Sequence, residues 1–208
     1  MNGFHLYLDS ADLAELRTCL PHPVIHGVTT NPTLLLRAGV KRNGLTALLH
    51  DCLDLGARQV QAQVHSADAD RMLDEARALA AEFDPGQLVV KIPATRDGLL
   101  AGAELAAAGL PITYTAVYAP EQAHFAALLG AAYAAPYLGR LEDSGINGLA
   151  LIAQMQSLIT QSGAATRLLV ASVRSRAAYL SLLALEVGAI TIPPRLFADL
   201  VDHTATLD

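Results

Sequence analysis

The feature that most constrains the fold of this chain is an alternation of strand-like and helix-like segments that recurs eight times. Short apolar runs, bounded by turn residues, alternate with segments whose apolar residues recur at helical spacing. The strand-like runs are 4–8, 24–28, 58–64, 88–93, 111–117, 131–138, 167–173 and 188–192. Strands separated by helices pair in parallel through helical crossovers. Eight such units predict a closed (β/α)8 (TIM) barrel, although 208 residues is short against the usual length of about 250.

An open, doubly wound sheet is the alternative arrangement for the same alternation. A dinucleotide-binding sheet would carry a glycine fingerprint after its first strand, but the sequence there is Asp9-Ser10-Ala11. The chain contains no linker, low-complexity tract or internal repeat, and its length suits one domain with a large core. We therefore expect residues 1–208 to form a single barrel domain.

Composition argues against several classes of protein. Hydrophobic residues make up 52% of the chain, yet no apolar run reaches the roughly 18 residues that a membrane helix needs. The first residues lack the charged and apolar regions of a signal peptide. The net charge is -6 and no basic stripe is present, so we expect neither a nucleic-acid partner nor a membrane partner. These properties predict a cytoplasmic location.

The residues that most often bind metals show no metal-binding pattern. Cys19 and Cys52 have neither metal-ligand nor redox spacing, and two cysteines provide no disulfide framework. The seven histidines are scattered, with no helical pair at metal-ligand spacing. We therefore expect no metal site and a reducing compartment.

One lysine lies in the most apolar strand. Lys91 is flanked by Val89, Val90 and Ile92, in a run that reads as a strand buried on both faces. Burying an ammonium group without a partner is strongly unfavourable, and loss of the proton leaves a neutral, nucleophilic amine. A lysine that only extends from the strand end to solvent is the bland alternative. However, the chain has twelve arginines and two lysines, and only lysine can form a Schiff base.

Polar side chains follow nearly all of the expected strands. In a (β/α)8 barrel the active site lies at the carboxyl ends of the strands. The groups expected there are Asp9, Thr29, Thr30, Asn31, Gln63, Lys91, Thr115, Tyr137, Arg140, Ser172 and Arg174. Each has a common structural alternative: Asp9 and Ser172 could cap helices, and Tyr137 could belong to the core. Taken together with a buried lysine, they predict a pocket.

A Schiff-base reaction gives each of the catalytic candidates a role. Lys91 is the candidate nucleophile. Tyr137 can act as the acid and base, through a water held by Gln63 and Thr115. Asp9 supplies an anion near the iminium. No cofactor is needed for this chemistry.

A second group of residues suits a polar, phosphorylated substrate. Asn31 and Thr29 can bind the hydroxyl groups of a sugar. Arg140, Ser172 and Arg174 provide guanidinium groups and a hydroxyl near a helix start, which suits a phosphate. The expected partner is therefore a small sugar or sugar phosphate.

Six segments, in colinear order over nearly the whole chain, resemble the short members of the transaldolase family. They are Leu-Tyr-Leu-Asp at 6–9, Gly-Val-Thr-Thr-Asn-Pro at 27–32, Val-Val-Lys-Ile-Pro at 89–93, Thr-Ala-Val-Tyr at 115–118, Ala-Pro-Tyr-Leu-Gly-Arg at 135–140 and Ala-Ser-Val at 171–173. The resemblance implies a (β/α)8 barrel with the Schiff-base lysine on strand four. Transaldolases typically carry glutamate on strand three and phenylalanine after the strand-six proline, whereas fructose-6-phosphate aldolases carry glutamine and tyrosine. Gln63 and Tyr137 therefore resemble the aldolase branch.

The resemblance also implies a homo-oligomer. Short family members usually end in a further helix that packs on a neighbouring subunit in a ring of five, often paired into a decamer. Residues 202–208 leave little chain for that helix, which puts the pentamer and the decamer in doubt. The loop at 142–147 is also expected to be shorter than its family counterpart.

The leading interpretation is a cofactor-independent class I aldolase. It would cleave fructose 6-phosphate to dihydroxyacetone and glyceraldehyde 3-phosphate, or catalyse the reverse reaction. One alternative is a transaldolase that passes the dihydroxyacetone unit to another sugar phosphate. The other is a non-catalytic sugar-phosphate binding protein, against which Lys91 and Tyr137 argue because binding alone requires neither.

Overall fold

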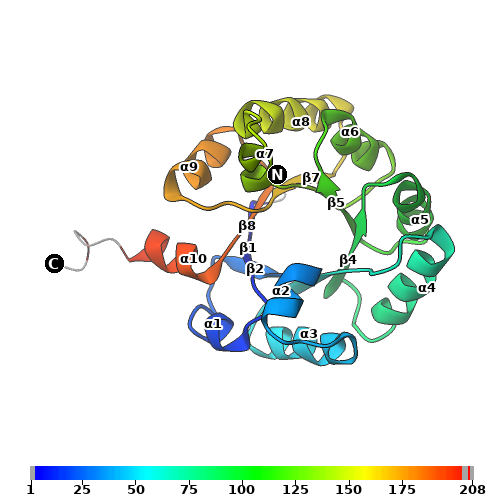
Figure 1. The fold of residues 1–208 in the computed structure, drawn as a ribbon, viewed down its shortest axis with the longest axis horizontal. Coiled ribbons are helices and arrows are strands. Elements are labelled where there is room, and N and C mark those ends of the chain that lie inside the picture. The colour runs from blue at the N-terminus through cyan, green and yellow to red at the C-terminus, as the bar shows by residue number, and fades with distance from the viewer. Residues whose placement is uncertain (1–2, 203–205, 207–208) are drawn as a thin grey trace.

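The structure is a computed structural model that describes residues 3–202 and 206, and its strands close into one barrel. The strands are β1 (His5–Asp9), β2 (Ile25–Thr29), β3 (Gln59–Gln63), β4 (Leu88–Pro93), β5 (Ile112–Val117), β6 (Tyr133–Pro136), β7 (Arg167–Val170) and β8 (Ala189–Ile192). Each strand pairs in parallel with the next, and β8 pairs with β1. The helices lie around these strands as an outer layer (Figure 1). The predicted (β/α)8 barrel is confirmed.

The helices fill the connections between successive strands. They are α1 (Leu13–Arg17), α2 (Pro32–Arg37), α3 (Leu45–Asp54), α4 (Ala69–Ala80), α5 (Arg96–Ala107), α6 (Pro120–Leu128), α7 (Leu138–Asp143), α8 (Gly148–Ser162), α9 (Arg176–Ala184) and α10 (Pro194–Val201), with a 3-10 turn η1 (Arg42–Gly44). Side-chain caps fix where several of them begin, because they bind backbone N–H groups that lack a partner in the first turn. Asp12 caps α1, Asn31 caps α2 and Thr95 caps α5.

The core has two parts, and β4 contributes to both. Val90 and Ile92 join the large apolar cluster between the barrel and its helices. Val89 faces the other way, into the barrel, where it packs with Tyr7, Tyr133, Ala135, Leu169 and Ala189. Because side chains alternate along a strand, Lys91 shares the inward face of Val89. The register therefore directs the lysine into the barrel.

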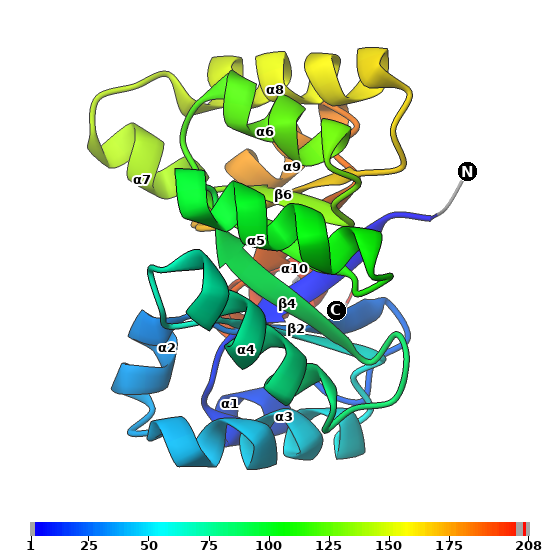
Figure 2. The same ribbon diagram turned by 90° about the vertical axis from the view of Figure 1, so that its right-hand side faces the viewer.

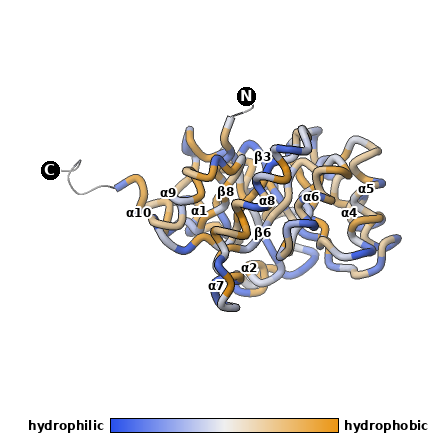
Figure 3. The backbone as a smooth tube through the Cα atoms, turned by 90° about the horizontal axis from the view of Figure 1, so that it is seen from above, coloured by the Kyte–Doolittle hydropathy of each residue, from blue (hydrophilic) through white to orange (hydrophobic). Residues whose placement is uncertain are grey.

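Two short helices project from one end of the barrel. α2 and α7 lie at the end opposite the N-terminus, which is the end where the strands finish (Figure 2). Seen from above, the same two helices extend beyond the rest of the chain (Figure 3). They therefore flank the rim at which the polar side chains were expected.

Two further expectations concern a membrane-spanning helix and the C-terminal end of the chain. Within the described ranges, no helix is long and apolar enough to cross a membrane. The doubt about the family pentamer rests on residues after α10, and 203–205, 207 and 208 lie outside the described residues.

Candidate active site

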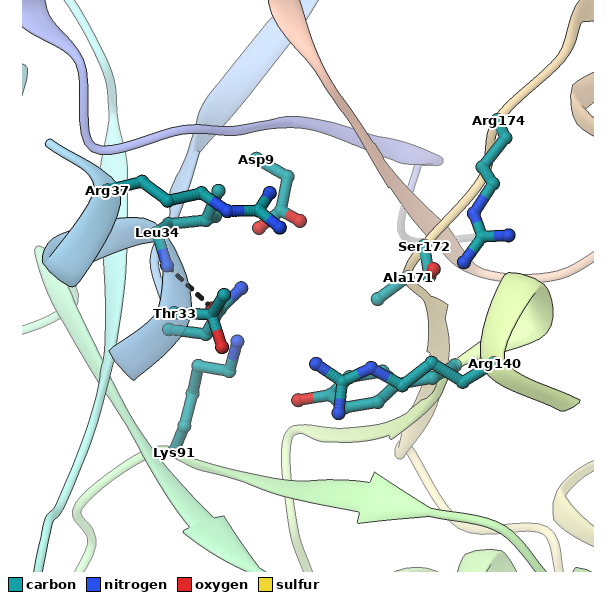
Figure 4. Close-up of a pocket in the computed structure, with 11 residues that line it drawn as sticks. Asp9, Thr33, Leu34, Arg37, Lys91, Arg140, Ala171, Ser172 and Arg174 are labelled. Carbon is teal, nitrogen blue, oxygen red and sulfur yellow. Dashed lines mark hydrogen bonds between the residues drawn. The ribbon is translucent and has the colours of Figure 1, made fainter. Parts of the chain in front are cut away.

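A polar cavity of about 250 Å³ opens at the carboxyl ends of the strands. It is lined by Asp9, Asn31, Thr33, Leu34, Arg37, Lys91, Tyr137, Arg140, Ala171, Ser172 and Arg174. Asp9, Arg37 and Lys91 lie on one side of the cavity, and Ser172, Arg174 and Arg140 lie on the other (Figure 4). Seven of the eleven side chains expected at this rim thus line one cavity. The other four are Thr29, Thr30, Gln63 and Thr115, which do not line it.

Lys91 lies at the base of this cavity and is 3% exposed. Its Nζ donates a hydrogen bond to the backbone carbonyl of Thr30, at 2.9 Å. Among the described residues its ammonium group forms no ion pair within 4.0 Å. One neutral acceptor holds the amine in place while leaving it accessible from the cavity, as a nucleophile requires.

Asp9 ends β1 and is held by Thr29. The Thr29 hydroxyl donates to Oδ1 of Asp9 at 2.8 Å and lies 2.7 Å from the Thr191 hydroxyl. Burial raises the pKa of Asp9, while the charge of Lys91, the Thr29 hydrogen bond and the charge of Arg140 oppose this rise. Thr29 is fully buried and does not line the cavity, so its hydroxyl holds the Asp9 carboxylate in place of the sugar-binding role predicted for it.

Tyr137 and Thr115 form a buried hydroxyl pair. Their oxygen atoms are 2.7 Å apart, and either can be the donor. Thr115 is fully buried behind Tyr137, whose ring is 9% exposed and lines the cavity. The Arg140 guanidinium carbon lies 4.9 Å from the centre of the same ring, a cation–π distance. Contacts on both sides thus fix the phenol at the cavity wall.

Gln63 lies next to Lys91 in the sheet but does not line the same cavity. The Cα atoms of the two residues are partners in the β3–β4 register. Gln63 lines two neighbouring cavities at the ends of β3 and β4 instead. In the part of the chain that the structure describes, its side chain forms no hydrogen bond. The water shared with Tyr137 therefore stays a prediction.

The opposite wall carries the predicted phosphate-binding residues. Arg140 lies in α7, and Ser172 follows β7 with a φ of 59°, a left-handed backbone that is uncommon for residues other than glycine. Both terminal nitrogens of Arg174 donate to the Asp143 carboxylate, at 2.6 Å each. Arg174 is thus already paired, whereas the Arg140 guanidinium stacks on Tyr137 and remains available to an anion.

Four lining residues were not predicted from the sequence. They are Thr33, Leu34, Arg37 and Ala171. The first three share one face of α2, at the spacing of three and four residues that brings helical side chains together. Counting in threes from Asn31 leads to Leu34 and then Arg37, which is the signal that could have identified these two.

The cavity does not resemble a metal centre. No group of three histidine, cysteine, aspartate or glutamate residues in ranges 3–202 and 206 is placed to hold an ion. The polar groups of the cavity suit a different chemistry: a buried amine, a phenol with a hydroxyl partner, a carboxylate, and guanidinium groups for an anion.

Comparison with known proteins agrees with this arrangement. A family profile described as "Transaldolase/Fructose-6-phosphate aldolase" matches residues 6–208. A protein from Caulobacter vibrioides named "Probable transaldolase" is 37% identical over 201 residues, covering 97% of this chain and 90% of the relative. Another with that name, from Syntrophobacter fumaroxidans, is 35% identical, covering 96% and 90%.

Solved structures show the same fold in a distant protein. A mandelate oxidase variant with an FMN adduct superimposes with a TM-score of 0.64 at 17% identity. The match covers 91% of this chain and 64% of the oxidase chain, so this chain spans less than two thirds of the oxidase. At that identity the likeness concerns the barrel fold alone.

Proposed function

The chain belongs to the transaldolase/fructose-6-phosphate aldolase family, whose members are enzymes of the class I aldolase and transaldolase kind, and on that premise we propose that it is a fructose-6-phosphate aldolase. The reaction would cleave fructose 6-phosphate to dihydroxyacetone and glyceraldehyde 3-phosphate, or form it from them. Family membership argues against the third interpretation, a non-catalytic binding protein.

The observation that carries the proposal is the placement of Lys91. Its amine lies 3% exposed at the base of a polar cavity, on the inward face of an otherwise apolar strand. Attack of this amine on C2 of the ketose would give a carbinolamine, and loss of water would give an iminium. Asp9 would stabilise the positive charge of that iminium, since its carboxylate lies in the same cavity.

The carbon–carbon bond would then break between C3 and C4. Removal of the proton from the C4 hydroxyl releases the aldehyde, and the bonding electrons move into the iminium to form an enamine. A proton delivered to C3 restores the iminium, and its hydrolysis releases dihydroxyacetone and free Lys91. Tyr137 would carry these protons, with Thr115 holding its hydroxyl at 2.7 Å.

The remaining wall would hold the rest of the substrate. Asn31, which lines the cavity, would bind a hydroxyl group of the dihydroxyacetone part, whereas the buried Thr29 would act through its hydrogen bond to Asp9. Arg140 and Ser172 would bind the phosphate, and Arg174 would support them through its pair with Asp143.

The aldolase branch is supported by Tyr137 and Gln63. A phenol at the cavity wall can deliver a proton to the enamine through a water, whereas a phenylalanine cannot. The second candidate function is a transaldolase, in which the enamine waits for another aldehyde. The names of the curated relatives favour this candidate.

One pair of measurements tests the proposal. Borohydride reduction in the presence of fructose 6-phosphate, followed by mass mapping, should place a covalent adduct on Lys91. With Tyr137→Phe, we expect release of free dihydroxyacetone to fall by at least about tenfold, the scale for a lost general acid or base. Transfer to an added aldehyde should fall less. A wild-type protein that transfers efficiently and releases little dihydroxyacetone would be a transaldolase.

We further propose a cytoplasmic location and a homo-oligomeric assembly. Free, buried Cys19 and Cys52 are consistent with a reducing compartment. Exposed apolar side chains on outer helices, such as Leu180 and Leu183 of α9, are consistent with contacts between subunits.

A further inference from the structure

We propose that Glu75 of α4 is a positioning residue for the reaction: it fixes the backbone after Gln63 and so sets the direction in which the Gln63 side chain leaves the end of β3, where its register partner is Lys91. The inference rests on the proposed function, because it assigns Glu75 to the proton-delivery step of that reaction. Glu75 does not line the cavity of Lys91 and would act through Gln63 alone.

The Glu75 carboxylate binds the loop that follows β3. Oε2 accepts hydrogen bonds from two consecutive backbone N–H groups, those of His65 at 2.7 Å and Ser66 at 3.3 Å. Oε1 accepts from the Ser66 hydroxyl at 2.8 Å and from the guanidinium of Arg42. The Glu75 side chain therefore anchors the backbone of two consecutive residues in a surface loop.

The charge state of Glu75 agrees with this role. Burial favours the neutral form, but the hydrogen bonds from His65 and Ser66, together with the charge of Arg42, outweigh it and lower the pKa of Glu75. The carboxylate is therefore ionised over the neutral pH range. Hydrogen bonds to an ionised acceptor are stronger than those between neutral groups.

The loop is two residues from Gln63, and Gln63 is next to the lysine. Val64 donates its N–H to the carbonyl of Lys91 at 3.1 Å, which ties the end of β3 to the nucleophile's own strand. Gln61 faces the barrel interior, where its Oε1 accepts from the Thr113 hydroxyl at 2.8 Å. Alternation along the strand gives Gln63 the same inward direction.

Little else determines where the Gln63 amide lies. Its side chain has no hydrogen-bond partner among the described residues, so the direction of the backbone at the strand end decides it. Gln63, His65, Glu75 and Arg42 also line one small cavity of about 270 Å³. Glu75 and Gln63 thus line the same cavity, although they lie on different elements.

The chain offers a matched control in Glu104. Glu104 forms an ion pair with Arg77 on the surface, as Glu75 does with Arg42. The Glu104 side chain is 56% exposed against 18% for Glu75, and its one described hydrogen bond is the one from Arg77. Glu104→Ala therefore removes an ion pair without releasing a loop.

The experiment compares Glu75→Ala, Glu75→Gln and Glu104→Ala, using fructose 6-phosphate as substrate. It measures kcat for release of free dihydroxyacetone, KM, transfer to added aldehyde, and the borohydride adduct on Lys91. In Glu75→Ala we expect kcat for release to fall by about fivefold, within the range of coupled residues in contact. The KM and the adduct should change little. Glu75→Gln keeps one acceptor oxygen and should recover part of the rate, and Glu104→Ala should match the wild type.

A double-mutant cycle separates positioning from stability. If Glu75 acts through Gln63, then Glu75→Ala should have almost no further effect on release in a Gln63→Ala background. If the Glu75→Ala and Gln63→Ala variants lower the release rate by independent factors that multiply in the double variant, the proposal is overturned. It is also overturned if Glu75→Gln and Glu75→Ala both release dihydroxyacetone as fast as Glu104→Ala. If Glu75→Ala does not fold, Glu75→Gln carries the same cycle. Absence of any adduct on wild-type Lys91 would instead refute the proposed function, and this role with it.

Discussion

At the scale of single residues, Lys91 is buried at the cavity with one hydrogen-bond acceptor, which suits the nucleophile that we propose. It is 3% exposed, shares the inward face of β4 with Val89, and has the carbonyl of Thr30 as its hydrogen-bond partner. A charged lysine is stabilised more by hydration at the surface than by the one hydrogen bond available at this buried position. The energetic cost of this placement is consistent with a role in catalysis.

Replacement of this residue separates chemistry from folding. Lys91→Met should abolish aldol cleavage and transfer, because no other described amine lines the cavity. Methionine is a long, flexible side chain that fits the apolar strand β4, so circular dichroism and the melting temperature should stay close to the wild type. Residual turnover, or a borohydride adduct on Lys41, would contradict the assignment.

The phosphate-binding role of Arg140 can be tested with two acceptor substrates. Arg140→Ala should raise KM for glyceraldehyde 3-phosphate by a factor that corresponds to about 1.5 kcal/mol of binding free energy. This value is the lower end of the range for a hydrogen bond to a charged group, because the arginine is exposed to solvent. KM for unphosphorylated glyceraldehyde should change little. Arg174→Ala serves as the comparison and should cost less, since its guanidinium already binds Asp143. Equal losses for both acceptors would show that Arg140 does not bind the phosphate.

The sequence placed most of these residues because a strand end is easy to recognise. Asp9, Lys91 and Tyr137 each follow or belong to an apolar run, and parallel strands bring their carboxyl ends together. Arg37 was missed because its direction depends on how α2 is rotated over the rim, which the Asn31 cap decides. The orientation of Gln63 was equally out of reach, because contacts of Glu75 twelve positions later fix the loop.

At the scale of elements, the connections were harder to predict than the strands. Asp9 was considered as a helix cap, but Asp12 caps α1 and Ser10 binds Glu15. Because α1 begins at Leu13, the Asp9 carboxylate is free to accept from Thr29. Short polar runs offer several possible caps, and the packing of the helix on the barrel selects one.

Helix α7 was not predicted, because the sixth strand was expected to continue to residue 138, whereas β6 ends at Pro136, and residues 142–147 were expected to form a loop. The helix covers Leu138–Asp143, has no side-chain cap and contains Gly139, so local sequence gives little sign of it. It forms because Leu138 and Leu141 are both buried, three positions apart. Tertiary packing therefore decides this element, and it brings Arg140 to the cavity.

Gly139 is required where α7 approaches the end of β7. A Cβ atom at this position would lie 2.6 Å from Nε of Arg174 and 2.7 Å from the carbonyl oxygen of Ser172. The carbonyl is backbone and cannot move aside cheaply, so Gly139→Ala should lower the free energy of unfolding by about 1–3 kcal/mol, as overpacking does. It should also raise KM for phosphorylated substrates, because α7 carries Arg140.

A second glycine provides the control. Gly44→Ala adds a Cβ whose nearest neighbour is Cγ1 of Val40 at 3.7 Å, an ordinary contact. Urea denaturation of both variants checks the prediction. Similar stabilities for the two would show that α7 can shift without cost.

At the scale of the whole molecule, the barrel is polar at both ends, and only one end is explained by the proposed reaction. At the amino ends of the strands, the His5 and His26 rings stack with centroids 3.7 Å apart. Nδ1 of His5 lies 2.7 Å from the Tyr133 hydroxyl, which lies 2.8 Å from the Tyr7 hydroxyl. This cluster could not be predicted from the sequence, because it forms only when the closed barrel brings Tyr133 of β6 against β1 and β2.

The surroundings of the stacked His5 and His26 rings favour the neutral form of both side chains. Burial, the neighbouring His26 and the charge of Arg167 lower the pKa of His5 to about 4. Burial, with the charges of Arg58 and Arg167, also lowers the pKa of His26. The charged groups acting on the pair are thus all positive, and protonation of either ring adds to their repulsion.

This arrangement predicts that stability falls as the solution becomes mildly acidic. In the unfolded chain a histidine titrates near pH 6.5, so between pH 6.5 and about 4 the unfolded state binds more protons than the folded state. The free energy of unfolding should therefore decrease as pH falls through this window, by about 1–2 kcal/mol once solvent screening of the half-exposed rings is allowed for.

His5→Asn keeps a polar partner for Tyr133 and should flatten this dependence in denaturant unfolding measured between pH 7 and 5. His50→Asn, at an exposed histidine stacked on Phe83, should leave the wild-type slope unchanged. An equal slope in the wild type and His5→Asn would mean that other groups control the acid response of the barrel.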